Sequence, residues 1–218
     1  MARLKLGVLI SGRGSNLQAL IEACADADFP AEIVLVLSNK PDAKGLAHAA
    51  NAGLATACIE HTGYPDRESF DRAVHEKLGA AGVELVCLAG FMRLLSGWFV
   101  ETWHDRIVNI HPSLLPSFKG IDAHEQAIAA GVKLSGCTVH IVRAEMDAGP
   151  ILVQAAVPVL PEDDTDSLAA RILTVEHRCY PLAVRLIAEG RMRITGDTAI
   201  VDMPRDTDAR IISPPAAE

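Results

Sequence analysis

Hydrophobic residues in the first half of the chain form short apolar runs that alternate with segments of helical spacing. Such short runs are typical of buried strands, and the segments between them gather their apolar residues on one helical face. Strands that alternate with helices favour a parallel sheet covered on both faces. Beginning with a strand, the pattern predicts strands and helices in turn at Leu4–Ile10, Leu17–Ala25, Glu32–Ser38, Ala43–Ala52, Ala55–Ile59, Arg67–Leu78 and Leu85–Ala89.

The second half of the chain has a different arrangement. A short strand at Ile107–Ile110 leads into a turn-rich loop, His111–Gly120, and a helix follows at Ala123–Ala130. The link between two further apolar runs, Gly136–Val142 and Ile151–Val159, is too short for a crossover helix, so these runs are predicted to pair antiparallel. The sequence therefore predicts an α/β fold of the three-layer, Rossmann-like type. Its sheet is mixed and mostly parallel, with an antiparallel pair near the C-terminal half.

The last long apolar pattern predicts a helix over Asp166–Glu189. Pro181 lies inside it and is expected to kink it, because proline removes the hydrogen bond to the carbonyl of His177. Residues 1–190 are expected to form the main domain, and residues 191–218 a hairpin and tail of the same domain. The hairpin strands and a frayed, Pro/Ala-rich end are predicted at Arg193–Thr195, Ala199–Val201 and Ser213–Glu218.

Composition narrows the range of functions. Half of the 218 residues are hydrophobic, and 20 Lys and Arg against 28 Asp and Glu give a net charge of −8. That balance argues against nucleic acid as a partner, since such binding rests on clustered basic residues. It leaves room for a small anionic ligand held by a few N–H groups and an arginine. The longest apolar runs are strand-sized, so no membrane span is predicted.

The five cysteines and eight histidines indicate no bound metal. No Cys-x-x-Cys spacing occurs, and the histidines lack the spacing of metal ligands. Most cysteines lie among apolar residues, which is typical of buried thiols in a reducing cytoplasm. The basic N-terminus lacks the long apolar stretch of a signal peptide. We therefore expect a cytoplasmic protein.

A glycine-rich turn, Ser11-Gly12-Arg13-Gly14-Ser15-Asn16, separates the first strand from its helix. Small residues at a helix start expose backbone N–H groups and make an anion site. The turn is not a Walker A loop, because no Gly-Lys-Ser/Thr follows, and Leu17 stands where a dinucleotide fingerprint needs its third glycine. A phosphate site is favoured over NAD, and a tight turn without a ligand is the alternative.

The most informative stretch is Asn109-Ile110-His111-Pro112 at the end of a strand. Residues two apart in a strand point the same way, and Pro112 keeps His111 extended. Ligands of open α/β sheets bind beyond the carboxyl ends of the strands. An amide donor beside an imidazole suits a developing oxyanion combined with a proton transfer. A lone histidine would more often be satisfied by local backbone, but this pairing favours catalysis.

Two loops carry weaker signals. Asp147, before Ala-Gly-Pro, is compatible with a simple turn residue. A carboxylate there could also reach a catalytic histidine and favour its charged form, if the strands ending at His111 and before Asp147 lie close in the sheet. The stretch Leu88–Leu95 leaves a buried strand as an apolar loop with one arginine. It fits either a core-covering connection or the wall of a pocket for a flat apolar ligand.

Four strings together resemble phosphoribosylglycinamide formyltransferases, members of the family of 10-formyltetrahydrofolate-dependent formyltransferases. The similarity runs in order from about residue 4 to residue 190, and the third string marks the wider family. The strings are Leu-Ile-Ser-Gly-x-Gly-Ser-Asn-Leu-Gln at 9–18, Leu-Ala-Gly-Phe-Met-Arg at 88–93, Asn-Ile-His-Pro-Ser-Leu-Leu-Pro at 109–116 and Asp-Ala-Gly-Pro at 147–150.

The resemblance implies transfer of a formyl group from 10-formyltetrahydrofolate to the amine of glycinamide ribonucleotide in purine synthesis, without a covalent enzyme intermediate. It places the catalytic residues at Asn109, His111 and Asp147. It places the ribonucleotide at Gly14, Ser15, Asn16, Leu17, Gln18 and Glu176. It places the folate at Arg67, Met92, Arg93, Leu94, Leu95, Asn109, Arg143, Ala144, Glu145, Met146 and Asp147. No role follows for Ser117–Gly120.

Rival functions share this chemistry or only the glycine turn. A methionyl-tRNA formyltransferase is expected to carry a nucleic-acid-binding domain after residue 190, and a formyltetrahydrofolate hydrolase a regulatory domain before the first strand. A non-catalytic nucleotide-binding module would use only the glycine turn and turn over no formyl donor. We expect small-molecule partners and a monomer or homodimer, with no nucleic acid, membrane or metal involved.

Overall fold

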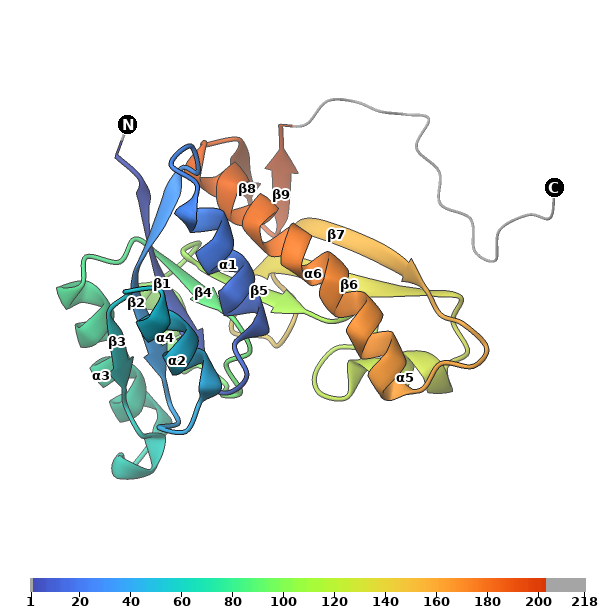
Figure 1. The fold of residues 1–218 in the computed structure, drawn as a ribbon, viewed down its shortest axis with the longest axis horizontal. Coiled ribbons are helices and arrows are strands. Elements are labelled where there is room, and N and C mark those ends of the chain that lie inside the picture. Colours follow the sequence, from blue (N-terminus) through green and yellow to red (C-terminus); the bar gives the residue numbers. More distant parts are fainter. Residues whose placement is uncertain (1, 203–218) are drawn as a thin grey trace.

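The computed structural model describes residues 2–202, and the tail predicted at Ser213–Glu218 lies outside them. Within the described part, seven strands form one sheet and two more form a hairpin (Figure 1). The strands are β1 Leu4–Ile10, β2 Ala31–Ser38, β3 Thr56–Cys58, β4 Leu85–Leu88, β5 Ile107–His111, β6 Leu134–Ile141, β7 Ile151–Pro158, β8 Met192–Thr195 and β9 Thr198–Val201. The helices are α1 Ser15–Ala25, α2 Lys44–Asn51, α3 Arg67–Ala80, α4 Gly97–Thr102, α5 Ala123–Ala129 and α6 Thr165–Ala188, with a 3₁₀ turn at His61–Gly63.

The sheet is mixed, with the strand order β3-β2-β1-β4-β5-β6-β7. The pairs from β3 to β5 are parallel, whereas β5–β6 and β6–β7 are antiparallel. The predicted mixed, mostly parallel sheet and the antiparallel pairing of the last two long strands are confirmed. In the antiparallel register of β5 and β6, Val108 lies opposite Ile141 and His111 opposite Thr138, so the loop after β6 begins beside the start of β5. It then folds back toward the end of β5, where Asp147 comes within 3.5 Å of His111.

Alternation along the strands divides the core into two layers. On β1, Leu6 and Val8 pack in one cluster with residues of α1, α2, α5 and α6, whereas Leu9 packs in the other with residues of α3 and α4. Side chains alternate across a strand, so a run that is apolar throughout supplies both clusters. The result is the predicted three-layer arrangement, with helices on both faces of the sheet (Figure 1).

Helix α6 connects distant parts of the fold. Asp164 and Ser167 form a capping box at its start, and the helix assignment continues through Pro181, so the expected kink there stays a prediction. The buried Tyr180 hydroxyl lies 3.0 Å from the carbonyl oxygen of Leu88 and 3.2 Å from that of Val108. The tyrosine thus joins the carboxyl end of β4 to the first half of β5.

The structure differs from the sequence prediction mainly in short elements. Helix α4 and the 3₁₀ turn were not predicted, because neither is long enough to show a helical period. Ser96 caps α4 by accepting a hydrogen bond from the N–H of Phe99. Helix α1 begins at Ser15, two residues before the first apolar position. The predicted hairpin is present as β8–β9, and β9 packs against β7.

Candidate active site

Asn109 and His111 lie at the carboxyl end of β5, on the same side of the strand as predicted. His111 is buried and Asn109 is half-buried. On the antiparallel neighbour β6, His140 lies opposite Asn109, and Thr138 lies opposite His111. The carboxyl end of β5 and the facing part of β6 thus carry an amide and two imidazoles.

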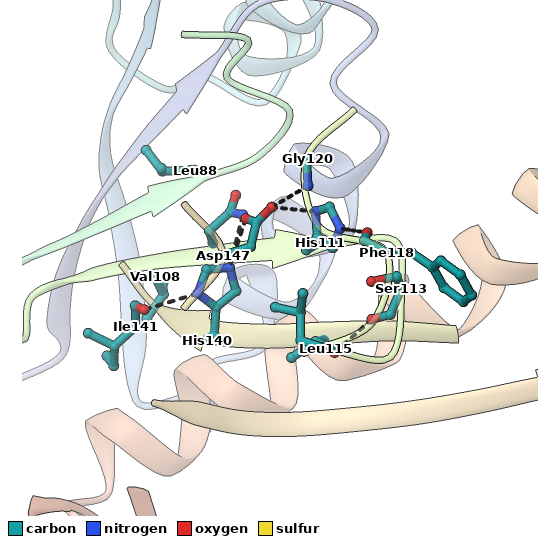
Figure 2. Close-up of polar contacts among 12 residues, drawn as sticks. Leu88, Val108, His111, Ser113, Leu115, Phe118, Gly120, His140, Ile141 and Asp147 are labelled. Carbon is teal, nitrogen blue, oxygen red and sulfur yellow. Dashed lines mark hydrogen bonds and ion pairs between the residues drawn. The ribbon is translucent and has the colours of Figure 1, made fainter. Parts of the chain in front are cut away.

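Asp147, in the loop between β6 and β7, lies between two imidazole rings (Figure 2). Its Oδ2 is 3.5 Å from Nδ1 of His111, and its Oδ1 is 3.7 Å from Nε2 of His140. The backbone N–H of Gly120 donates a 2.8 Å hydrogen bond to the same Oδ2. Asp147 has a φ of 51°, a left-handed conformation that aspartate adopts more readily than most residues. The predicted approach of Asp147 to His111 is observed, and the carboxylate is only 10% exposed.

The segment Ser117–Gly120, to which the sequence assigned no role, aligns both groups through its main chain. The carbonyl oxygen of Phe118 lies 2.9 Å from Nε2 of His111 and accepts a hydrogen bond from its N–H. The next turn of the loop supplies the Gly120 N–H to Asp147. The loop thus fixes the His111 ring through Nε2, and the Asp147 carboxylate faces its other nitrogen.

Its surroundings favour the neutral form of His140. Burial lowers its pKa, and this outweighs the opposing effects of the Ile141 carbonyl and the Asp147 carboxylate. Its Nδ1 lies 3.0 Å from the Ile141 carbonyl oxygen, which only accepts, so the proton of the neutral ring is on Nδ1. The free lone pair on Nε2 then accepts from Nδ2 of Asn109, 3.2 Å away. His140 thus orients the Asn109 amide with its N–H groups toward the imidazole.

Several groups of this cluster were missed from the sequence. His140 was counted among histidines without a role, because its place opposite Asn109 depends on a strand register that no motif reveals. His124 at the start of α5 lies near enough to His111 to be affected by its charge, and burial lowers the pKa of His124. The carbonyl of Phe118 and the N–H of Gly120 are main-chain groups, so the amino-acid type at these positions does not indicate their role.

The glycine turn forms the second part of the site. Gly14 has a φ of 78° and precedes α1, and no side chain caps the helix. A Cβ atom on Gly14 would lie 2.6 Å from Cα of Gly45, so the close approach of the turn to α2 requires glycine at this position. Ser15 and Gln18 line a cavity at this point. The side chain of Leu17 is fully buried, so any ligand contact there falls to its backbone.

Asn16 and Glu176, both assigned to the ribonucleotide, are brought together across 160 residues of sequence. Nδ2 of Asn16 donates a 2.7 Å hydrogen bond to Oε2 of Glu176, and both side chains are buried. Burial raises the pKa of Glu176 more than this hydrogen bond and the nearby His177 and His111 lower it. The pair joins the start of α1 to the middle of α6, beside the catalytic cluster.

The residues assigned to the folate lie on loops around the same edge of the sheet. Met92 and Leu94, between β4 and α4, are 76% and 55% exposed, and Met146, after β6, is 50% exposed. Apolar side chains exposed to this extent on neighbouring loops are typical of a ligand site. The Ser11 hydroxyl joins this region to the glycine turn, because it accepts a 2.8 Å hydrogen bond from the N–H of Met92 and donates one of 2.6 Å to Oδ1 of Asn39.

The predicted arginines have different surroundings. Arg67 lines a cavity of about 650 Å³ at the starts of α3 and α4. Arg67 and Arg93 both lower the pKa of the buried Asp71 carboxyl, although burial raises it more. Arg143, by contrast, pairs with Asp105, so its guanidinium is already engaged. The other folate residues predicted, Leu95, Ala144 and Glu145, lie in the same two loops as Met92 and Met146.

Residues 2–202 contain neither a membrane-spanning helix nor a cluster of metal ligands. In residues 2–202, no helix is long and apolar enough to cross a membrane. Across the same range, no group of three or more His, Cys, Asp or Glu side chains is arranged to hold a metal ion.

Comparison with known proteins identifies the architecture. Residues 4–184 match the family described as formyl transferase. The chain belongs to this family. Formyl transferases of two kinds are similar to it. The phosphoribosylglycinamide formyltransferase of Escherichia coli is 42% identical over 202 residues, which are 93% of this chain and 95% of that protein. The trifunctional purine biosynthetic protein adenosine-3 of Gallus gallus is 50% identical over 192 residues, 88% of this chain.

The chain spans about a fifth of the length of that trifunctional relative, 19%. Among solved structures, the glycinamide ribonucleotide transformylase 1 of Symbiobacterium toebii superposes with a TM-score of 0.90 at 49% identity, covering 91% of this chain and 94% of that one. A formyltetrahydrofolate deformylase from Pseudomonas syringae superposes with a TM-score of 0.84 at 26% identity, covering 91% of this chain and 66% of that one. The same fold therefore occurs in a protein named as a transformylase and in one named as a deformylase.

Proposed function

We propose that this formyl transferase moves a formyl group from 10-formyltetrahydrofolate to the amine of N1-(5-phospho-D-ribosyl)glycinamide, a step of purine synthesis in the cytoplasm. The observation that carries the proposal is the Asn109–His111–Asp147 cluster at the sheet edge, between an uncapped glycine turn and exposed apolar loops. The similarity to phosphoribosylglycinamide formyltransferases over nearly the whole chain supports it.

Asn109 and His111 stabilise the negative charge that develops on the formyl oxygen when the amine attacks. One N–H of Asn109 is donated to His140, so the other remains for the oxyanion. Nδ1 of His111 is 3.5 Å from Asp147, longer than a good hydrogen bond, so this ring nitrogen remains available to the substrate. Preorganised donors in a buried site commonly supply the largest single contribution to catalysis.

Asp147 acts by charge and position rather than as a nucleophile. Its carboxylate faces His111 and is oriented by the N–H of Gly120. It holds the imidazole in place to stabilise an oxyanion and donate a proton. His111, or a water held by Asp147, supplies the proton that the leaving nitrogen takes up. We propose no covalent adduct with the enzyme, because direct attack by the amine requires none.

The exposed apolar loops fit a flat co-substrate. Met92 and Leu94 on one loop and Met146 on another offer apolar surface, and Arg67 and Arg93 supply cations at one end. We assign the pterin ring to the loops and the acidic tail to the arginines. When bound, the co-substrate supplies the activated formyl group.

The decisive experiment follows consumption of the formyl donor by absorbance, with and without glycinamide ribonucleotide. Consumption that needs the ribonucleotide supports the transferase. Equal consumption in its absence would identify a hydrolase, in which water takes the place of the amine, and no consumption in either case would leave a binding module.

The folate assignment is tested with Leu94→Asp, because a charge on the apolar wall disfavours the pterin ring. A folate analogue should raise the melting temperature of the native protein and not that of the variant. Protection by the ribonucleotide should persist in both. Leu160→Asp, at a similarly exposed leucine between β7 and α6, is the control and should keep both effects. Loss of both effects in Leu94→Asp would mean that Leu94 supports the core.

A further inference from the structure

A cavity of about 410 Å³ opens at the start of α1. Besides the glycine turn, helices α2 and α6 form its walls. Its lining is unusually basic for a chain with a net charge of −8. The lining residues are Arg13, Gly14, Ser15, Gln18, Lys44, His48 and His177.

The basic groups around this cavity have no acidic partners of their own. Among residues 2–202, the side chains of Arg13, Lys44 and His48 make no hydrogen bond and no ion pair. Nε2 of His177 is buried and likewise has no hydrogen-bond partner in the described part of the chain. The unpaired cations of Arg13 and Lys44 beside an uncapped helix start raise the local positive potential and favour an anion.

Helix α2 is fixed against the glycine turn. The N–H of Gly45 donates a 3.1 Å hydrogen bond to the carbonyl oxygen of Gly12. A Cβ atom at Gly14 would lie 3.7 Å from Cδ2 of His48, so the imidazole edge is beside the turn. Lys44 and His48 are four residues apart and therefore lie on one face of the helix.

We propose that Lys44 and His48 of α2, together with Arg13, form a cationic wall that binds the phosphate of the ribonucleotide opposite the backbone of the glycine turn. The inference rests on the proposed function. Phosphate oxygens accept several charge-assisted hydrogen bonds at once, and a lysine and an arginine beside backbone N–H groups provide them. Glu176, the acidic group that acts on His177, is itself bonded to Asn16. It lies on the side of the catalytic cluster and leaves this wall cationic.

The first test measures formyl transfer by Lys44→Ala, His48→Gln and the double variant. Each single change should raise the KM for the ribonucleotide by roughly fivefold to tenfold, and the double change by more, with kcat preserved. The KM for the formyl donor should stay constant. Lys40→Ala is the matched control, because Lys40 is exposed and does not line the cavity. It removes the same charge from the same region and should leave both constants unchanged.

The second test removes the phosphate instead of the protein group. With the dephosphorylated substrate, ribosylglycinamide, Lys44→Ala and His48→Gln should have no effect, since a double-mutant cycle isolates the contact that both changes remove. Binding of ribose 5-phosphate, followed by calorimetry, should weaken in the same variants. This measurement does not depend on formyl transfer.

The outcomes separate the two proposals. If the native enzyme transfers formyl to the ribonucleotide but Lys44→Ala and His48→Gln match Lys40→Ala, the cationic wall is wrong and the proposed function stands. If no transfer occurs but ribose 5-phosphate binds and depends on Lys44 and His48, the wall stands and the function is wrong. Equal losses with the phosphorylated and dephosphorylated substrates would overturn the wall by showing that α2 acts through the fold.

Discussion

The parallel and antiparallel halves of the sheet contribute different kinds of groups to the site. After β1, a contiguous turn presents backbone, and its geometry depends on the absence of a side chain at Gly14. At the β5–β6 edge, side chains from separate segments meet: Asn109 and His111 from one strand, His140 from the next and Asp147 from a loop. The first arrangement suits recognition of an anion, and the second suits chemistry that needs charge and protons.

The largest effect is expected from Asp147→Asn, which keeps the shape of the side chain and removes its charge. We expect kcat to fall by about 10²- to 10⁴-fold, as loss of an acid–base or oxyanion-stabilising group does. The KM values should change little, and steady-state kinetics measures both. Asp197→Asn, the same change at an exposed aspartate between β8 and β9, is the control. A near-normal kcat in Asp147→Asn would reduce Asp147 to a turn residue and leave Asn109 and His111 as the reacting groups.

A smaller loss is expected from His140→Leu, because His140 touches Asn109 rather than the reacting atoms. Loss of the acceptor for the Asn109 amide should lower kcat by roughly 5- to 100-fold, the range for one partner of a buried hydrogen bond. His140→Gln offers an amide oxygen in place of Nε2 and should recover part of the rate. Equal kcat values for the two variants, with melting temperatures matched, would show that orientation of Asn109 is not the role of His140.

The backbone half of the site is tested with Gly14→Ala against Gly53→Ala. Both glycines have positive φ, 78° and 73°, but a Cβ on Gly53 meets no atom within 4 Å. Gly53→Ala should cost about 1–2 kcal/mol of unfolding free energy from the left-handed backbone alone. Gly14→Ala should cost more, because its Cβ meets the Gly45 backbone, and it should also raise the KM for the ribonucleotide. Urea unfolding and kinetics measure the two effects, and equal costs would remove the close approach as an explanation.

The smallest effect concerns the pH dependence of stability at Glu176. Because burial raises its pKa in the folded protein above the ordinary value of 4.5, the folded state holds this proton at pH values where the unfolded state has lost it. Stability therefore falls as pH rises from 4.5 through the raised value. Glu176→Gln should remove this pH dependence, and above the raised pKa the variant should be more stable relative to the native protein. Urea unfolding over a series of pH values measures the difference. If the pH dependence of stability stays the same in Glu176→Gln, or changes equally in the exposed control Glu125→Gln, burial of Glu176 is not its cause.

The sequence predicted features that depend on neighbouring residues better than features that depend on separate segments coming together. The apolar runs predicted which segments form strands and which form helices, because buried strands and amphipathic helices have distinct periods. The spacing of Asn109 and His111 predicted a shared face, since strand alternation is local. Asp147 needed the resemblance to known enzymes, because its contact with His111 depends on strands that lie side by side only after folding.

Other features could not be predicted from the sequence for physical reasons. His140 faces Asn109 only because β5 and β6 pair in one particular register. The Phe118 carbonyl and the Gly120 N–H belong to the main chain, which every residue shares, so residue type does not mark them. The pairing of Arg143 with Asp105, similarly, depends on where two loops come to lie.

The Ser11 hydroxyl has a consequence for how the two substrates assemble on the enzyme. It donates to Asn39 beside the glycine turn and accepts from the N–H of Met92 on the apolar loop. We therefore expect a ligand that orders the turn to order the loop as well. The reverse holds equally, because thermodynamic coupling between two sites is reciprocal. If the ribonucleotide raises the affinity for the formyl donor by some factor, the donor raises the affinity for the ribonucleotide by the same factor. The stability of the ternary complex does not depend on the order of binding, and the Ser11 hydroxyl is a contact that joins its two halves.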